Sequence, residues 1–331
     1  MTSERPLDDF RVLLAAPRPR DGQAAERVVR EFGNYAPAGG SLGRLEELAA
    51  WLAGWSGRPR PMILRPLLAI FAGSHGVAAR NVSPLPTDSA AAQVERCRSG
   101  AAPVCQLCST HDIGLKVFDL ALDLPTGDIT VGPALDERAT AATMAFGMEA
   151  IAGGTDLLCL SDFGVGNSTV AAAVCAALFG GRGADWVGGE PGAAGSLAGR
   201  KAGMVDAALS VHGGKLTDPL EVLRRLGGRE FAAVAGAIIA ARSERIPVVL
   251  DGHVAVAAAA VLHAVNPDAI GHCLLAGLSG DAGQAKAASR LGLKPLLDLE
   301  ISDSGVAGAL AAGLLKAAVT CHSAIAISGA R

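Results

Sequence analysis

Residues 157–174 read LLCLSDFGVGNSTVAAAV, an apolar run followed by two glycines, three polar residues and an alanine-rich segment. The apolar run predicts a buried strand, and the segment after it predicts a helix over 167–179. Gly164 and Gly166 allow a sharp turn between the two. Amides at the start of a helix bind anions. Three residues at this helix start are therefore candidate phosphate ligands: Asn167, Ser168 and Thr169.

This stretch is not one of the common nucleotide-binding motifs. It lacks the Gly-Lys-Ser/Thr of a Walker A loop and the third glycine of a dinucleotide fingerprint. An ordinary glycine-rich turn between a strand and a helix explains the same residues equally well. The pattern alone therefore leaves phosphate binding and a plain structural turn both open.

The alternation of apolar runs and helical segments extends along the chain. The strand of the opening stretch is predicted at 156–161, and further strands are predicted at 67–72, 115–120, 247–250 and 271–276. Further helices are predicted at 24–32, 42–55, 89–109, 136–152, 199–210, 219–226, 229–242, 253–264, 282–291 and 305–317. Apolar strands separated by helices indicate a parallel sheet covered on both faces, so the predicted fold is α/β with a doubly wound parallel sheet.

Three segments are predicted to be irregular. The first 35 residues are polar and charge-mixed and are expected to form a mobile arm with one helix. The Gly/Pro stretch at 36–41 is expected to stop that helix. A Gly-rich segment at 180–200 is expected to form a long loop.

Composition excludes several classes of protein. The chain has 331 residues, of which 50% are hydrophobic and 18% charged, with a net charge of −3. Such a chain can bury a large core, and without a basic run it has no electrostatic footprint for nucleic acid. The runs Phe231 to Ala241 and Gly305 to Leu315 are shorter than the ~18 residues of a membrane span. No secretory signal opens the chain, and seven cysteines, an odd number, favour a reducing cytoplasm over a disulfide framework.

Ligands of such sheets bind beyond the carboxyl ends of the strands. Four clusters follow predicted strands: Ser74-His75, 161–169, Asp251-Gly252-His253 and Ser279-Gly280-Asp281. Cys105 and Cys108, with His111 nearby, have the spacing of half a zinc site or of a redox pair. No second pair lies at zinc-finger spacing, so two buried helix cysteines are the favoured interpretation, and neither a metal nor a cofactor is expected.

Six blocks in a consistent order carry a resemblance to a known family: GGSLGRLEELAAWLAGW, FAGSHGVAARNVSPLP, DFGVGNSTVAAAVCAALFGG, DPLEVLRRLGGRE, PVVLDGHVAVAAAAVLHAVNP and LGLKPLLDL. Together they resemble the nicotinate mononucleotide:5,6-dimethylbenzimidazole phosphoribosyltransferases of cobalamin biosynthesis, from about Gly39 to the C-terminus. The resemblance implies transfer of ribose 5-phosphate from nicotinate mononucleotide to a nitrogen of an aromatic base. It also implies a homodimer, and a heteromer with a related chain is the alternative if this chain is a paralogue of a catalytic relative. The composition and the short apolar runs predict no nucleic-acid partner and no membrane partner. Each chain would have a Rossmann-like domain over 61–299 and a smaller helical domain from 1–60 and 300–331.

The resemblance also assigns residues. Phosphate and ribose would be bound by Gly164, Gly166, Asn167, Ser168, Thr169, Lys201 and Asp251. The base would be bound around Ser74, His75, Asp88, Phe163 and Gly305. The alternatives are a solvated helix lysine for Lys201 and a structural, hydrogen-bonding histidine for His75, and in both cases the resemblance favours the pocket role.

The chain departs from the family where the catalytic base should be. Gly305 stands where the family has a glutamate, and Ser302 where it has an arginine, while Asp162 replaces a glutamate before the glycine loop. Either another carboxylate serves as base, or the chain is a catalytically impaired nucleotide-binding paralogue that acts as a partner or regulatory subunit. The candidate bases are Asp303 and Asp162, with Asp88 and Glu300 as further carboxylates, because burial can raise a carboxyl pKa toward neutrality. On this interpretation Gly305→Glu should raise turnover. A dinucleotide-dependent oxidoreductase is a third interpretation, which the missing fingerprint disfavours.

Overall fold

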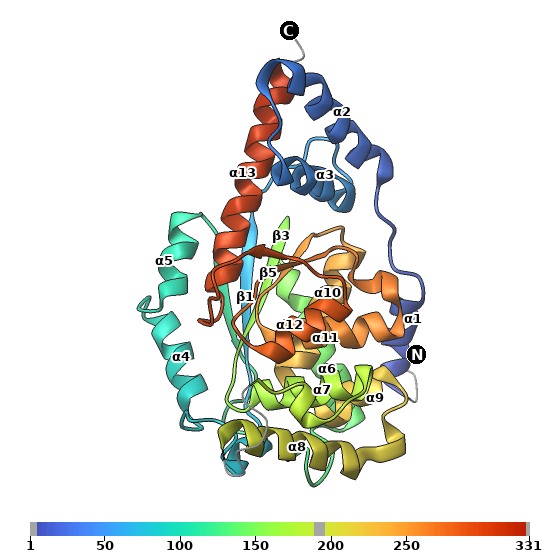
Figure 1. The fold of residues 1–331 in the computed structure, drawn as a ribbon, viewed down its shortest axis with the longest axis vertical. Coiled ribbons are helices and arrows are strands. Elements are labelled where there is room, and N and C mark those ends of the chain that lie inside the picture. Colours follow the sequence, from blue (N-terminus) through green and yellow to red (C-terminus); the bar gives the residue numbers. More distant parts are fainter. Residues whose placement is uncertain (1–4, 189–195, 329–331) are drawn as a thin grey trace.

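The computed structural model describes residues 5–188 and 196–328, and at its centre lies a six-stranded parallel sheet (Figure 1). The strands lie in the order β2-β1-β3-β4-β5-β6. The chain adds β2 on one side of β1 and all later strands on the other, so the direction of strand addition reverses between β2 and β3. Their bounds are β1 Pro66–Ala72, β2 Gly114–Asp119, β3 Leu157–Phe163, β4 Val248–Leu250, β5 Cys273–Gly277 and β6 Pro295–Leu297. This confirms the predicted α/β class with a parallel sheet.

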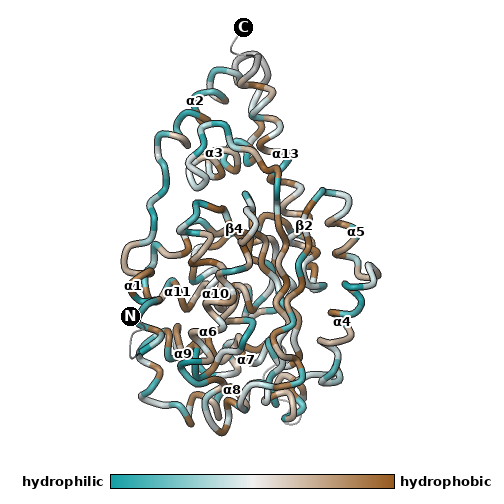
Figure 2. Tube along the Cα trace, turned by 180° about the vertical axis from the view of Figure 1, so that it is seen from behind, coloured by the Kyte–Doolittle hydropathy of each residue, from teal (hydrophilic) through white to brown (hydrophobic). Residues whose placement is uncertain are grey.

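Helices cover both faces of the sheet. The core on one side of the sheet includes residues of α1 Leu7–Ala15, α6 Glu137–Met148, α7 Asn167–Phe179, α8 Leu197–His212, α9 Pro219–Leu226, α10 Arg229–Ser243, α11 His253–Val265 and α12 Ala282–Arg290. The core on the other side includes residues of α2 Gly22–Gly39, α3 Arg44–Ser56, α4 Ser89–Arg98, α5 Pro103–Thr110 and α13 Val306–Ser328. Figure 2 shows the hydrophobic residues gathered along the strands, with hydrophilic segments toward the outside.

Strand geometry divides the apolar residues of β1 between these two cores. Leu67, Ala69 and Phe71 belong to the core under α10 and α11. The alternate residues Leu68, Ile70 and Ala72 belong to the core under α3 and α13. Successive side chains of a strand point to opposite faces, so a continuous apolar run fits a strand that is covered on both sides.

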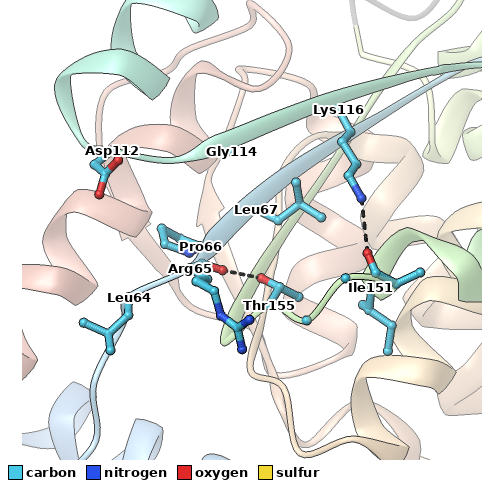
Figure 3. A pocket seen from close by; sticks show the side chains of 12 residues that line it. Leu64, Arg65, Pro66, Leu67, Asp112, Gly114, Lys116, Ile151 and Thr155 are labelled. Atoms are coloured by element: carbon cyan, nitrogen blue, oxygen red, sulfur yellow. Dashed lines mark hydrogen bonds between the residues drawn. The ribbon is translucent and has the colours of Figure 1, made fainter.

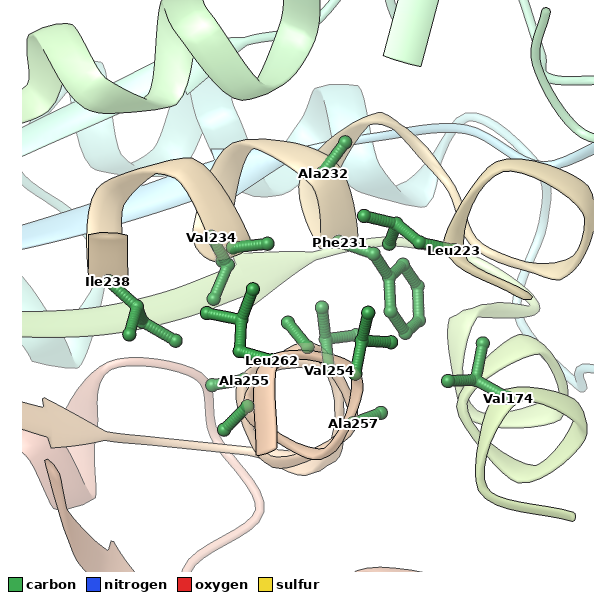
Figure 4. Close-up of a cluster of buried hydrophobic side chains, with 14 of the residues drawn as sticks. Val174, Leu223, Phe231, Ala232, Val234, Ile238, Val254, Ala255, Ala257 and Leu262 are labelled. Carbon is green, nitrogen blue, oxygen red and sulfur yellow. The ribbon is translucent and has the colours of Figure 1, made fainter. Parts of the chain in front are cut away.

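The larger core is built from small side chains on helices that approach closely. Figure 4 shows α10 and α11 side by side, with Phe231, Val234 and Ile238 facing Val254 and Leu262. On the other side of α10, a Cβ at Gly236 would lie 1.9 Å from the carbonyl oxygen of Met144. The backbones of α6 and α10 therefore touch at positions where only glycine fits.

The secondary structure differs from the sequence predictions at five places. The expected arm contains α1, whose Leu7, Phe10 and Leu14 are buried at helical spacing. Helix α2 continues to Gly39, past the expected stop. The single helix predicted over 89–109 is two, α4 and α5, because Gly100 adopts φ +73° and Pro103 opens α5. Strand β6 was not predicted, and α13 extends to Ser328. The loop predicted at 180–200 lies partly outside the described residues.

Helix α13 is the long element at the C-terminal end. Its N-terminal half packs on the sheet, and beyond that it contacts α2 and α3, which project from the sheet in Figure 1. Val306–Ala326 is the one helix of the described residues long and apolar enough to cross a membrane. Half of that stretch is buried within the protein, as in a core helix. The division into two domains at residues 60 and 300 stays a prediction. Helix α1, which that division places in the smaller domain, packs against α6 and α11 of the larger one.

Candidate active site

A pocket of about 160 Å³ lies at the carboxyl ends of β3 and β4. Helices α7 and α11 begin directly after these strands, and α12 begins after the neighbouring β5. The lining residues are Asp162, Asn167, Ser168, Asp251, Gly252, His253, Val254, Ser279, Asp281, Ile301, Ser302, Asp303 and Ser304. The helix N-termini that meet here carry partial positive charge, so the pocket combines an anion-attracting end with four aspartates.

The glycine loop positions the start of α7. Gly166 caps the helix with φ +84°, a conformation that favours glycine. The Asn167 amide donates to Asp162 at 2.6 Å, and its carbonyl accepts the Ser168 amide at 2.9 Å. The Thr169 amide donates to the carbonyl of Gly166 at 3.0 Å. The predicted free amides of Ser168 and Thr169 are therefore engaged within the loop, which leaves the Ser168 side chain to face the pocket.

Lys201 reaches this loop from α8. Its Nζ donates to the Ser168 hydroxyl at 2.9 Å. Burial lowers the pKa of Lys201, and the charge of Asp281 opposes that shift. The structure thus brings Lys201 and Ser168 together as the sequence predicted, although the two lie 33 residues apart.

A second polar pair borders the same end of the pocket. His253, the first residue of α11, has Nδ1 3.4 Å from the Asp281 carboxylate at the start of α12. Burial opposes the ionisation of Asp281, yet His253 and the amides of Gln284 and Gly283 hold the pKa of Asp281 down to about 2. The sequence placed both residues in post-strand clusters without giving them a role.

Asp162 is the most perturbed carboxyl group of the pocket. It lies at the end of β3 and is 5% exposed. Burial raises the pKa of Asp162 to about 8, and the charges of Glu230 and Asp251 add to the rise. The Asn167 amide opposes it. Asp162 is therefore a carboxyl group that exchanges its proton near neutral pH, as a general base must.

Asp251 follows β4 and has a different environment. It accepts the Gly308 amide at 2.9 Å, which ties it to the first turn of α13. Burial raises the pKa of Asp251 to about 6, while the amides of Gly308 and Gly305 oppose the rise and Asp303 adds to it. Asp251 is therefore more readily ionised than Asp162.

The loop before α13 forms the mouth of the pocket. Asp303 lines the pocket and is exposed. Gly305 is buried with φ +83°, and a Cβ there would lie 2.8 Å from Cγ2 of Val104 and 3.2 Å from Cδ1 of Ile70. A side chain at position 305 would point into the core under α13, away from the carboxylates. From this geometry we expect Gly305→Glu to destabilise the protein, whereas the sequence-based prediction was a higher turnover.

The other residues predicted for base binding are not on the walls of this pocket. His75 is buried and paired with Glu230 of α10. Phe163 is buried in the core under α13, and Asp88 is exposed immediately before α4. Ser74 lies between β1 and His75 with a buried hydroxyl that has no partner. Glu230 was not predicted, although its position two residues after Gly-Gly at a helix start was visible in the sequence.

The cysteines form no disulfide in the described structure. Cys105 and Cys108 lie on α5 as free thiols, and Cys108 is buried. Burial raises the pKa of Cys108 to about 12, so its thiol stays protonated. Among residues 5–188 and 196–328, no group of three or more His, Cys, Asp or Glu is arranged to hold a metal ion.

A second pocket, of about 360 Å³, lies at the opposite edge of the sheet, where β1 and β2 begin (Figure 3). Arg65 and Lys116 line it, and Lys116 donates to the carbonyl of Ala152 at 3.4 Å. Helices end at this edge, so backbone carbonyls face the pocket and attract cations. It contains none of the residues predicted for the site.

A parallel α/β sheet whose anion-attracting pocket also holds buried carboxylates is typical of enzymes that act on phosphorylated small molecules. A family model described as a phosphoribosyltransferase matches residues 18–330, and the chain belongs to this family.

Similar proteins extend over nearly the whole chain. A nicotinate-nucleotide-dimethylbenzimidazole phosphoribosyltransferase from Brucella anthropi is 55% identical over 324 residues, covering 97% of this chain and 95% of the relative. One of the same name from Allorhizobium ampelinum is 55% identical over 322 residues, covering 97% and 94%. A crystal structure of this enzyme from Thermus thermophilus matches with a TM-score of 0.81 and 32% identity, covering 92% and 96%. These findings confirm the resemblance identified from the sequence.

Proposed function

We propose that the chain transfers the 5-phosphoribosyl group of nicotinate mononucleotide to a ring nitrogen of 5,6-dimethylbenzimidazole or a similar base, in the synthesis of the cobalamin lower ligand. The observation that carries this proposal is Asp162, a buried carboxyl group with a pKa near 8 beside an anion-attracting pocket. It suits a reaction that needs one proton removed and one phosphate held.

The phosphate of the donor would lie at the start of α7. The Ser168 hydroxyl and Lys201 already touch there, and the N-termini of α7 and α11 add favourable dipoles. A charge-assisted contact to Lys201 would orient the ribose toward β4. Asp251, whose carboxylate is fixed by the Gly308 amide, would accept a hydrogen bond from a ribose hydroxyl.

The chemistry is a displacement at the anomeric carbon. The lone pair of one base nitrogen forms a bond to that carbon, while the bond to the pyridinium nitrogen breaks and its electron pair leaves with nicotinate. The pyridinium is already cationic, so this departure needs little acid assistance. The proton on the other nitrogen of the base passes to the Asp162 carboxylate. Asp303, at the exposed mouth, is the second candidate base.

The test is a transfer assay. The purified chain is incubated with nicotinate mononucleotide and 5,6-dimethylbenzimidazole, and both nicotinate and the phosphoribosylated base are quantified by chromatography. Equal amounts of the two products are expected, with no nicotinate released when the base is omitted. Intact nucleotide binding without either product would instead identify a catalytically impaired paralogue.

Two further properties are proposed: a cytoplasmic location, from the seven cysteines and the absence of a secretory signal, and a homodimer, from the resemblance. Light scattering of the purified chain tests the second, since a monomer mass would contradict it. Ser74, His75, Asp88, Phe163 and Gly305 remain predictions for the base side of the site.

A further inference from the structure

A buried ion-pairing group that the proposed reaction does not use lies beside the site. Glu230, in the first turn of α10, has a side chain with 0% exposure. One of its carboxylate oxygens contacts Nε2 of His75, whose side chain is 1% exposed. The other oxygen, Oε2, has no hydrogen-bond partner. A buried carboxylate oxygen without a partner is costly, so a reason for keeping it there is needed.

The fold directs this unpartnered oxygen toward the end of the central strands. A Cβ on Gly73 would lie 2.1 Å from Glu230 Oε2, so the carboxylate fills the space that a side chain would take. The Gly73 amide in turn donates to the carbonyl of Phe163 at 2.9 Å. Asp162 is the residue before Phe163 and lies opposite Phe71 in the register of β1 and β3. Glu230 therefore reaches the strand end that carries Asp162.

We propose that Glu230 is a positioning residue: held by His75, it keeps Asp162 able to take up the proton of the incoming base near neutral pH. This proposal rests on the proposed function, in which Asp162 is the base. Among charged neighbours, Glu230 makes the largest contribution to the raised pKa of Asp162. An aspartate with an unperturbed pKa would be ionised but too weak a base to compete for that proton.

The other groups facing Asp162 act in different ways. Asp251, from the end of β4, also raises the pKa of Asp162, but less than Glu230 does. Asn167, from α7, donates its amide to Asp162 and favours the ionised form. His75 contacts Glu230 and fixes where its charge lies. Replacing Glu230 by a neutral residue of the same shape therefore removes one defined source of the shift.

The experiment compares the pH dependence of kcat/KM in the wild type and Glu230→Gln. Removing a negative neighbour makes Asp162 easier to ionise, so the acid limb should move to lower pH by about one unit. The dissociation constant of nicotinate mononucleotide should stay within about twofold, since Glu230 lies outside the pocket. Glu244→Gln, at the exposed C-terminal end of the same helix, is the matched control. Its acid limb in the pH profile of kcat/KM should lie at the same pH as in the wild type.

Two further measurements separate this proposal from the proposed function. His75→Gln keeps the charge of Glu230, so it should not move the acid limb of the kcat/KM profile to lower pH. Carbon-13 NMR of the side-chain carboxyl groups in the wild type should show the Glu230 signal responding at the pH where Asp162 titrates. This readout needs neither activity nor a variant that folds. A silent Glu230 signal through that transition, or an unchanged limb in folded Glu230→Gln, overturns the proposal. Full activity of Asp162→Asn would overturn the assignment of Asp162 as the base and, with it, this role of Glu230, but not the transfer reaction itself.

Discussion

The two pockets at opposite edges of the sheet differ in size and in chemistry. The one where β1 and β2 begin is more than twice as large, about 360 Å³ against about 160 Å³. Its charged groups, Arg65, Lys116 and Asp112, are on the rim, and the Asp112 side chain is 95% exposed. The smaller pocket holds Asp162 and Asp251, both 5% exposed.

The difference arises from the direction of the chain. In a parallel sheet with crossover helices, every helix begins near the carboxyl ends of the strands and finishes near the amino ends. Amides and positive dipole ends therefore gather at the smaller pocket, and carbonyls at the larger one. Burial then shifts the pKa of carboxyl groups only at the smaller pocket, where the loops cover them. Chemical environment, rather than volume, identifies the site.

The largest expected effect is on turnover. Asp162→Asn should lower kcat by about 10²- to 10⁴-fold, because the proton acceptor is lost while the binding groups remain. Lys116→Met, in the larger pocket, should leave kcat unchanged. Steady-state kinetics of both variants test the contrast. A kcat within threefold of wild type for Asp162→Asn would move the role of base to Asp303.

Next in size is a stability effect at Gly305. Gly305→Glu should destabilise the protein by about 2–4 kcal/mol, because φ is +83° and the new Cβ would overlap Val104. Gly153→Ala, in the larger pocket, has φ +97° but nothing within 4 Å of the new Cβ, so only the backbone strain of about 1 kcal/mol is expected. Urea unfolding measures both. An unchanged midpoint with higher turnover for Gly305→Glu would restore the sequence-based expectation.

A smaller effect concerns donor binding. Lys201→Met should weaken the binding of nicotinate mononucleotide by about 10- to 100-fold, since a hydrogen bond to a charged group contributes about 1.5–3 kcal/mol. Arg65→Met, a cation of the larger pocket, is the matched control with no expected change. Isothermal titration calorimetry gives both dissociation constants. Equal weakening in the two variants would argue that the overall charge of the protein, and not the group of residues at the start of α7, binds the phosphate.

The stability of the protein should also depend on pH. The folded pKa of Asp162, about 8, lies above its ordinary 3.8, so the native state binds more protons than the unfolded state between these values. Its contribution is full below about pH 4 and is lost as the pH rises through about 8. The melting temperature should therefore fall more steeply from pH 5 to pH 9 in the wild type than in Asp162→Asn. Asp112→Asn, at an exposed carboxyl of the larger pocket, should retain the wild-type slope.

Local patterns were enough to predict most of the fold. The helices at 167–179 and 219–226 have the predicted bounds, because each combines a defined start with a run of good helix formers. The elements that were not predicted are those whose secondary structure depends on tertiary packing. Helix α1 is held by three apolar side chains that pack on α6 and α11, and β6 is a three-residue edge strand stabilised by pairing with β5.

For the site, the family, the glycine loop and the polar residues that follow each strand were all predictable from the amino-acid sequence. These depend on spacing along the chain, which a sequence shows directly. The folded structure was needed to show which carboxyl group is buried, that Glu230 of α10 reaches the end of β3 past Gly73, and that position 305 faces the core. Those properties depend on burial and on the distances between residues tens of positions apart, because both the cost of desolvation and the interaction of charges are set by the folded surroundings.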